Sequence, residues 1–219
     1  MRKGIPALLL TLSLLLCGCR LLPERIPPAG LTVHFIDVGQ ADCALLESGG
    51  EYMLIDGGNR EDGQLVVSYL EQQGVEELAY VVCTHAHEDH VGGLPSVLAV
   101  YPTHAVYAPT RTYASKVFDD FVHYADQQRL EITIPSPGDG WTLGETSVTV
   151  LGPVQSYADP NDTSIILRVE YGGTSFLFTG DMETSAENDM LDYWGSRMSW
   201  ETDVLKVGHH GSDTSTGYR

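Results

Sequence analysis

The sequence predicts an α/β fold in which mixed sheets are covered by helices. Strand-like segments alternate with amphipathic segments, but some strands follow one another directly through the glycine pairs 49–50 and 172–173. Glycine occurs 23 times in 219 residues, which indicates many tight turns. Frequent hairpins exclude a purely parallel, doubly wound sheet. No segment repeats with a period of 20–50 residues, which argues against a solenoid.

In the first half of the chain, β-branched and aromatic residues predict five strands and apolar spacing predicts three helices. The strands are 31–39, 42–48, 52–58, 78–84 and 104–109, and the helices are 62–74, 92–102 and 114–128. Segment 78–84 is almost continuously apolar, which is typical of a buried strand. It leads directly into His85.

The second half has the same mixed character. Strands are predicted at 131–135 and within 141–153, a hairpin at 163–181, a helix at 185–195, and a strand within 201–212. This last strand looks buried and runs into a second histidine pair. Lys206 lies within it, and the pattern leaves open whether this side chain reaches a functional site or lies at an edge.

The N-terminal segment 1–19 is predicted to be a signal peptide rather than part of the fold. Arg2 and Lys3 precede the apolar run 8–16, which is too short to span a bilayer. The segment ends in Leu-Cys-Gly-Cys and resembles a bacterial lipobox, so we expect Cys19 to carry a lipid and to anchor the protein outside the cytoplasm. Plain secretion is the alternative.

Residues 20–30 contain three prolines and no periodic pattern, so they are predicted to be a tether. The folded domain is then 31–219. Its cysteines, Cys43 and Cys83, lie in strand-like segments and are compatible with a disulfide or with two buried thiols. The formal charge of −18 disfavours binding of nucleic acid unless bound cations supply positive charge.

The chemistry is concentrated in residues 84–93, THAHEDHVGG. Three of the eight histidines and two acids lie within six residues. Imidazole nitrogen and carboxylate oxygen are zinc ligands. Residues i and i+2 point to different faces of a helix, so His85 and His87 converge only in a loop. Asp89 and His90 can serve a second ion.

Two other predicted strands end in similar residues. Asp181 follows FLFTG, and His209 and His210 follow DVLKVG. Strand ends are suitable anchors because the sheet fixes the backbone while the side chains remain free. A bridging carboxylate and a further histidine would complete a two-metal site, so the sequence predicts metal binding.

These motifs resemble the metallo-β-lactamase superfamily of hydrolases, and most closely the extracytoplasmic domain of ComEC-type competence proteins and its stand-alone relatives. The similar stretches are FIDVGQAD (35–42), LIDGG (54–58), THAHEDHVGGL (84–94), TSIILRVEYGGTSFLFTGD (163–181) and DVLKVGHHGSDTST (203–216). The resemblance implies a four-layer αββα sandwich with its metal site at one edge. The family fold continues beyond GHHGS, so we expect the C-terminal part to be missing.

The resemblance implies two divalent ions, zinc or manganese. It assigns His85 and His87 to one ion, Asp89 and His90 to the other, and Asp181 to both. The final ligand is His209 or His210, and we favour His210, with His209 facing the substrate as a catalytic residue.

Further residues match family positions around the site. Asp56 would hold the histidine loop, and Asp37 and Asp42 would lie nearby without being usual ligands, with turn formation as the alternative for all three. Many superfamily members have another histidine before the bridging aspartate. Here that region is YADPNDTS, where Asn161, Asp162 or a water would complete the coordination of the first ion. Ala41 replaces a usual glycine.

The resemblance predicts a hydrolase that uses a metal-bound hydroxide, acting on a phosphodiester at the outer face of the cell membrane. Asp89 would orient the water or shuttle its proton. Its partners would be a phosphodiester or small-molecule substrate, DNA held through the metals, and the membrane. The alternatives are a lactonase or β-lactamase and a non-catalytic surface module linked to DNA uptake.

Overall fold

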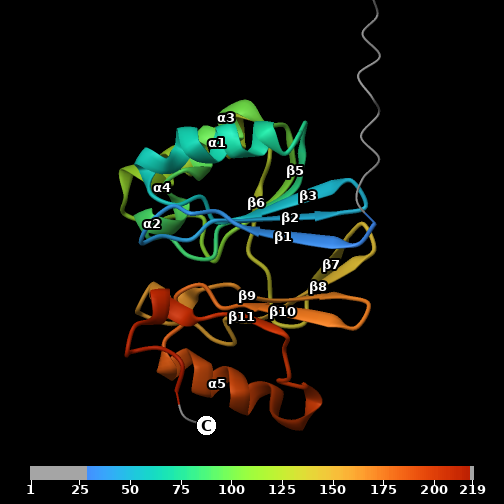
Figure 1. The fold of residues 1–219 in the computed structure, drawn as a ribbon. Coiled ribbons are helices and arrows are strands. Elements are labelled where there is room, and N and C mark those ends of the chain that lie inside the picture. The colour runs from blue at the N-terminus through green and yellow to red at the C-terminus, as the bar shows by residue number, and fades with distance from the viewer. Residues whose placement is uncertain (1–28, 218–219) are drawn as a thin grey trace, which may run out of the picture.

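The computed structural model describes residues 29–217, which form four layers (Figure 1). Helices cover the outer face of a six-stranded sheet, a five-stranded sheet packs against its inner face, and helix α5 covers the outside of that second sheet. The predicted αββα sandwich is therefore confirmed. The proposed signal peptide, Cys19 and almost all of the tether lie outside the described residues.

The first sheet has the strand order β1-β2-β3-β4-β5-β6. Its strands are β1 (Leu31–Phe35), β2 (Ala44–Ser48), β3 (Glu51–Ile55), β4 (Leu78–Val82), β5 (Thr103–Tyr107) and β6 (Ile132–Thr133). The first three strands form antiparallel pairs, and β3 to β6 run parallel. The parallel strands bring the residues that follow them to one edge of the sheet.

The second sheet has the order β11-β10-β9-β8-β7. Its strands are β7 (Gly140–Leu143), β8 (Thr146–Gly152), β9 (Ile166–Tyr171), β10 (Thr174–Phe178) and β11 (Val204–Lys206). Antiparallel pairing joins β7 to β10, including the predicted hairpin around Gly172 and Gly173, whereas β10 and β11 are parallel.

Helices α1, α3 and α4 lie over the first sheet and α5 lies under the second (Figure 1). The helices are α1 (Gly63–Gln72), α2 (Glu88–Val91), α3 (Leu94–Val100), α4 (Lys116–Gln127) and α5 (Thr184–Trp194). Short 3₁₀ turns are η1 (Arg60–Asp62), η2 (Asn161–Thr163), η3 (Gly195–Arg197) and η4 (Gly208–Gly211). The helix predicted at 92–102 is shorter than expected, and the one-turn helix α2 precedes it.

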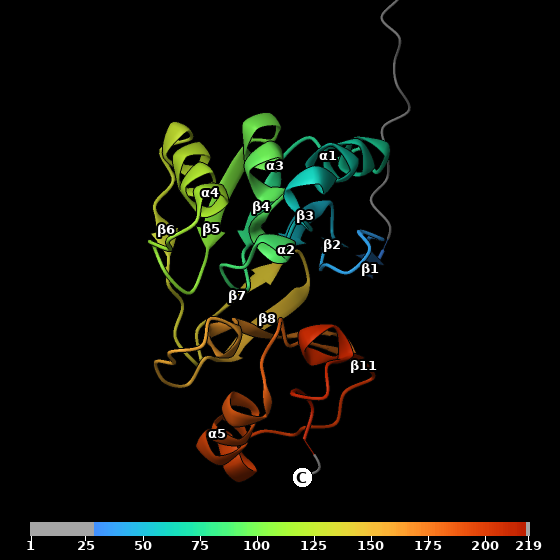
Figure 2. The ribbon, with the colours of Figure 1, turned by 90° about the vertical axis from the view of Figure 1, so that its left-hand side faces the viewer.

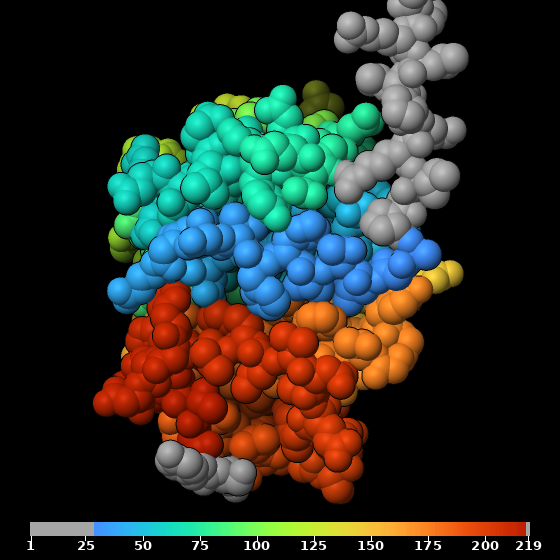
Figure 3. Space-filling view, in the orientation of Figure 1, coloured from blue at the N-terminus to red at the C-terminus, as the bar shows by residue number. Residues whose placement is uncertain are grey.

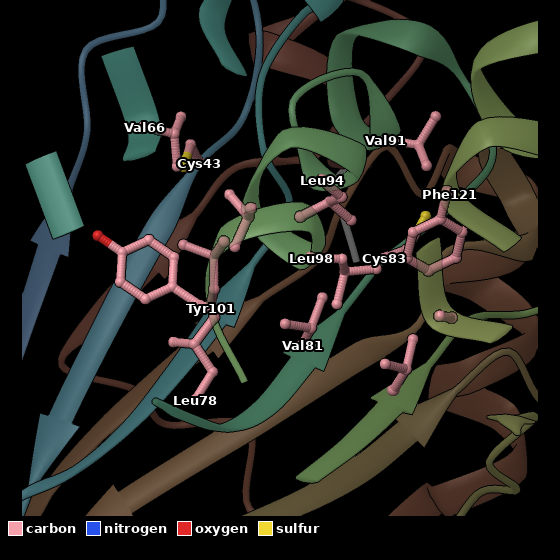
Figure 4. Close-up of a cluster of buried hydrophobic side chains, with 14 of the residues drawn as sticks. Cys43, Val66, Leu78, Val81, Cys83, Val91, Leu94, Leu98, Tyr101 and Phe121 are labelled. Atoms are coloured by element: carbon pink, nitrogen blue, oxygen red, sulfur yellow. The ribbon is translucent and has the colours of Figure 1, made fainter. Parts of the chain in front are cut away.

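Three apolar clusters fill the three interfaces between the layers. In β2, Leu45 faces the cluster under the helices, and Leu46 faces the cluster between the sheets. Figure 4 shows part of the first cluster, in which Leu94 and Leu98 of α3 lie near Val81 of β4. The third cluster, around Met190, joins α5 to the second sheet. Because both faces of β2 are buried, this strand lacks the polar alternation of a surface strand.

The front of the molecule consists of two stacked halves (Figure 3). The N-terminal half contributes the first sheet and its helices, and the C-terminal half contributes the second sheet and α5. None of the helices within residues 29–217 has the length and apolar character needed to cross a membrane.

One strand resolves an alternative that the sequence left open. The segment around Lys206 looked buried, with an edge position as the alternative, and β11 is an edge strand, with Leu205 and Val207 each 43% exposed. The apolar run is therefore no reliable sign of burial here, because only one long edge of β11 pairs with another strand of the described region.

Candidate metal centre

The predicted site residues meet at the edge where parallel strands of both sheets end, which faces the viewer in Figure 2. Asp56 follows β3 and His85 follows β4, whereas Asp181 follows β10 and His209 follows β11. Each sheet thus delivers the carboxyl ends of its parallel strands to the same place. The spatial gathering that the sequence predicted is present.

Asp56 fixes the start of the histidine loop. Its Oδ1 accepts a hydrogen bond from the backbone N of Thr84 at 2.7 Å, and its Oδ2 accepts one from Thr84 Oγ1 at 2.7 Å. The same Oδ2 lies 2.9 Å from Nδ1 of His90. Asp56 is 1% exposed, so this network is sealed from solvent. The geometry is that of a carboxylate which orients a metal-ligating histidine through its other nitrogen.

Close packing of glycines holds the helical part of the loop against the strand that carries Asp56. A Cβ atom on Gly93 would collide with the backbone carbonyl of Gly57, and one on Gly92 would collide with the backbone of Arg60. The backbone N of Gly57 donates to the carbonyl of His90 at 2.7 Å. The Gly-Gly pair after His90 therefore has a steric cause.

His85 and His87 form one half of the candidate site. Nε2 of His85 lies 3.1 Å from Nδ1 of His87, and 3.9 Å from Oδ2 of Asp181. His85 is fully buried, and burial lowers the pKa of its imidazole well below the usual value. A neutral imidazole is the form that binds a metal ion.

A second group is more compact. One ligand atom from each of Asp42, His90, Asp181 and His210 lies within 4.8 Å of the others. Nε2 of His210 is also 3.2 Å from Oδ2 of Asp89 and 3.4 Å from Oδ2 of Asp181. Asp181 thus lies between the two histidine groups, which is the place predicted for it.

Two buried atoms in this group indicate that a cation fits. Nε2 of His90 and Oδ1 of Asp181 face each other at 3.1 Å, yet neither has a hydrogen-bond partner with acceptable geometry among the described residues. Buried polar atoms of this kind are costly and rare. Imidazole nitrogens and carboxylate oxygens together are a donor set that suits zinc.

The charges of the cluster are strongly coupled. Burial disfavours charge on His90, but Asp56 and Asp181 outweigh it and raise the pKa of His90 to about 10. Burial likewise disfavours charge on Asp181, but the adjacent positive charge of His90 holds the pKa of this carboxyl well below its usual range. A hydrogen bond to Asp42 raises the pKa of His210. Without a metal ion, protons therefore supply the positive charge that the carboxylates require.

His209 and His210 occupy left-handed backbone, with φ of 46° and 52°. Two consecutive non-glycine residues in this region are uncommon and strained. The turn directs His210 into the compact group and leaves His209 nearer to solvent, with 31% of its side chain exposed. Nδ1 of His209 lies 3.1 Å from Oε1 of Glu183, and its Nε2 lies 3.9 Å from Oδ2 of Asp181. This agrees with the predicted roles, which stay predictions.

Asp42 belongs to the cluster, although the sequence placed it only nearby. Its carboxylate forms a short ion pair with Lys206, and Nζ of Lys206 also donates to the carbonyl of Gly180 at 2.7 Å. Lys206 Nζ is 3.7 Å from Oδ1 of Asp181. Lys206 therefore reaches the site from an edge strand, so both alternatives hold. Asp37, in contrast, accepts a hydrogen bond from the backbone N of Gly39 and forms a turn.

The region without the usual histidine lies beside Glu183, which the sequence analysis missed. Asp162 accepts a hydrogen bond from the backbone N of Glu183 at 3.0 Å, at the start of α5. Asn161 donates from Nδ2 to Glu183 at 3.3 Å, and its buried Oδ1 has no hydrogen-bond partner among the described residues. Glu183 lies two residues after Asp181, and this proximity is the only signal that could have found it.

The other candidates lie outside the compact group, although Sγ of Cys83 donates a hydrogen bond to the backbone carbonyl of His85 at 2.9 Å. Cys43 and Cys83 are both buried free thiols, so the disulfide alternative is not present. His34 contacts the hydroxyl of Tyr69 at 3.0 Å, and His104 pairs with a surface glutamate.

Comparisons with known proteins agree with this geometry. Residues 36–218 match the family described as the Metallo-beta-lactamase superfamily. The chain is 27% identical to ComE operon protein 3 of Bacillus subtilis (strain 168) over 84% of its length, and 31% identical to Recombination protein 2 of Haemophilus influenzae over 93%. These alignments cover 26% and 24% of those proteins, so the chain spans about a quarter of these relatives.

A solved structure shares the fold. The subclass B3 metallo-beta-lactamase MEM-A1, isolated from a soil metagenome library, superposes with a TM-score of 0.56 and 15% identity, covering 84% of this chain and 80% of that one. At this identity the likeness concerns the fold alone. The family match extends over most of the chain and includes every candidate ligand. The chain therefore belongs to the metallo-beta-lactamase superfamily.

Proposed function

We propose that this protein is a phosphodiesterase that works with two divalent ions, zinc or manganese. The position of Asp181 carries the two-ion part of the proposal. This carboxylate is 1% exposed, and its oxygens lie 3.1 Å from Nε2 of His90, 3.4 Å from Nε2 of His210 and 3.9 Å from Nε2 of His85. A buried carboxylate between histidine groups is suited to bridge two cations.

The residues divide into two ligand sets that share Asp181. His85 and His87 would hold one ion, and Asp89, His90 and His210 would hold the other, with Asp42 as a further oxygen ligand. Bound divalent ions lower the pKa of water and stabilise negative charge on a phosphoryl oxygen.

Two side chains at the open side of the cluster can move protons. Asp89 has 31% of its side chain exposed, so it can accept a proton from the attacking water. His209 is exposed to the same extent, and Glu183 holds its Nδ1. Its Nε2 can donate the proton that the leaving oxygen requires when the phosphorus–oxygen bond breaks. The carboxylate behind His209 orients the ring, as in other histidine acids and bases.

The phosphodiester is proposed on the strength of the competence-protein relatives, because the ligand set alone also suits a lactone or a β-lactam. A β-lactamase of this superfamily usually keeps the additional histidine that is absent from 157–164. A surface module without catalysis, linked to DNA uptake, is the alternative from another class.

Elemental analysis and a substrate screen test the proposal. The purified protein, loaded with zinc or manganese, is assayed with bis-p-nitrophenyl phosphate, nitrocefin and a lactone. We expect about two metal ions per chain and turnover of the phosphate diester. Bound metal without turnover of any of the three substrates would favour the non-catalytic binding module. Turnover of nitrocefin or of the lactone alone would show a β-lactamase or a lactonase in place of a phosphodiesterase.

We further propose that the protein is a lipoprotein outside the cytoplasm, anchored through Cys19. The proposal is supported by the lipobox-like residues 16–19, which lie outside the described residues. Cells grown with an alkyne-labelled fatty acid should label the protein, and Cys19→Ala should abolish the label. If the protein is secreted without a label, the lipid anchor is contradicted, but the location outside the cytoplasm still stands.

A further inference from the structure

A cleft of about 530 Å³ adjoins the loop that carries the candidate ligands His85 and His87. Ala86, which lies between the metal-ligating His85 and His87, forms part of its wall. The other walls come from the loops that follow β5, β6 and β8. The volume is within the range of pockets that hold small organic ligands. A group attached to a phosphate at the metal centre could therefore extend into this cleft.

The lining of the cleft is uncharged. None of the described residues that line it is Lys, Arg, Asp or Glu. Its walls contain five prolines, which are Pro109, Pro135, Pro137, Pro153 and Pro160. Proline has a fixed φ and few conformers, so such walls are rigid. A rigid, neutral cleft does not favour a second phosphate.

The nearest basic side chain in sequence is turned away. Arg111 stands between Thr110 and Thr112, which both line the cleft. Its Nε donates to the carbonyl of Ile132 at 3.0 Å, and its Nη2 pairs with Glu131 at 2.8 Å. Arg111 is thus engaged elsewhere. With a formal charge of −18 on the whole chain, the protein has little to offer to a long polyanion beyond its metal ions.

Two tyrosines give the cleft aromatic rings on which a flat, uncharged group can stack. Tyr113 is partly buried, and its ring meets His87 edge-on with centroids 6.2 Å apart and also packs against Phe118. Tyr157 comes from the loop after β8, and its hydroxyl donates to Asp189 of α5 at 3.1 Å. Both rings are therefore held in place by neighbouring elements. Fixed aromatic faces next to a phosphate site are typical of sites that bind nucleobases by stacking.

We propose that this cleft binds one uncharged ring of the substrate, a nucleoside attached to the reacting phosphate, and that the substrate is a short phosphodiester rather than a long nucleic acid. The inference rests on the proposed function for its phosphate position and specifies the substrate class. Recognition would come from the metal ions at one phosphate and from stacking in the cleft.

Binding measurements test the cleft separately from turnover. The zinc-loaded protein is titrated with inorganic phosphate and with thymidine 5′-monophosphate by calorimetry. The nucleotide should bind more tightly than phosphate, by on the order of tenfold. Tyr113→Leu keeps an apolar side chain against Phe118 but removes the aromatic face, and it should abolish most of this preference. Tyr193→Leu, at an exposed tyrosine on α5, is the matched control and should preserve it.

Equal affinities for phosphate and nucleotide, or a preference that survives Tyr113→Leu, would overturn the inference. A 20-residue oligothymidylate tests the length. The oligonucleotide should bind more tightly than the mononucleotide only by the statistical factor that arises because it offers several equivalent nucleotides. An affinity that drops by about a thousandfold between 50 and 200 mM salt would show a long polyanion site and refute it. A preference for the nucleotide without turnover of any diester would refute the proposed phosphodiesterase activity. The inference that the cleft binds a nucleoside would still stand.

Discussion

Oδ2 of Asp56 lies 2.9 Å from Nδ1 of His90, while Nε2 of the same ring faces Asp181 at 3.1 Å. One imidazole thus joins a buried carboxylate that is bonded to Thr84 to the carboxylate at the centre of the site. Asp56 itself has left-handed backbone, with φ of 58°, which asparagine and aspartate tolerate better than other side chains. The strand end after β3 is therefore shaped to orient a ligand from another loop.

We predict that Asp56→Asn lowers zinc affinity by about 10- to 100-fold, because the ring of His90 loses the negative charge that orients it and raises its basicity. Asparagine retains the shape and the left-handed backbone. Competition with a fluorescent chelator measures the affinity. Asp37→Asn, at an exposed turn acid, is the control and should bind zinc as the native protein does. Equal zinc affinities in the two variants would show that Asp56 does not contribute to the metal site.

Lys206 provides a second prediction, because its ammonium pairs with Asp42 and approaches Asp181. Lys206→Met leaves these carboxylates short of positive charge, so the metal-free protein should lose about 1–3 kcal/mol of stability. Bound zinc supplies the missing charge, so the loss should be smaller in the zinc-loaded protein. Urea unfolding of both forms measures the difference. Lys116→Met, which breaks an exposed pair, should change neither form by more than about 0.5 kcal/mol.

Much of this fold could be predicted from local sequence pattern. The hairpin at Gly172-Gly173 and the amphipathic α4 are found within a few residues of their predicted places, because turn chemistry and apolar spacing are local signals. The burial suggested for β11 was wrong because its apolar residues, Val204 and Leu205, carry no information about how many strands will pair with the segment. The four-layer arrangement came only from the family resemblance, and the order of the strands in the two sheets was not predicted.

The site shows the same division. Residues 85–90 and 209–210 were predicted because histidines clustered in sequence are rare. Asp42 and Glu183 join them through contacts between distant segments, which no spacing rule contains. The left-handed turn at 209–210 is equally non-local, since two consecutive residues other than glycine rarely adopt that backbone and the surrounding structure must impose it.

Metal binding should release a proton from His90. Asp56 and Asp181 raise the pKa of this ring to about 10, so it is protonated at pH 8 in the metal-free protein and must become neutral to bind an ion. The apparent affinity for zinc should rise with pH, by about tenfold per unit, up to that pKa. Calorimetric titrations at pH 8 in buffers with different ionisation enthalpies should show release of about one proton. Release of none would contradict the protonated ring.

The same pKa determines how the metal-free protein responds to pH. Because the folded-state pKa of His90 is above the unfolded value of about 6.5, its contribution to stability is complete below pH 6.5. The contribution is lost as the pH rises towards 10. We therefore expect the metal-free protein to become less stable over this window and the zinc-loaded protein to lose less. Chemical unfolding of both forms at pH 6.5 and pH 9.5 measures the two slopes, and parallel slopes would contradict the assignment.

The two adjacent histidines should separate metal binding from catalysis. His210 lies in the compact group with Asp42, His90 and Asp181, so His210→Ala should lower the zinc content as well as turnover. His209 lies outside that group and is backed by Glu183. His209→Ala should keep two zinc ions per chain but lower kcat about 10²- to 10⁴-fold on a diester with a poor leaving group.

The leaving group provides the control for this role. A p-nitrophenolate departs without a proton, so His209→Ala should affect bis-p-nitrophenyl phosphate much less than a thymidine dinucleotide, whose alkoxide needs one. His123→Ala, at a surface histidine bonded to Gln127, should leave both rates and the zinc content unchanged. A fall to one zinc ion in His209→Ala would contradict the role as acid. Nε2 of His209, 3.9 Å from Asp181, would then be a metal ligand in place of the histidine missing from 157–164.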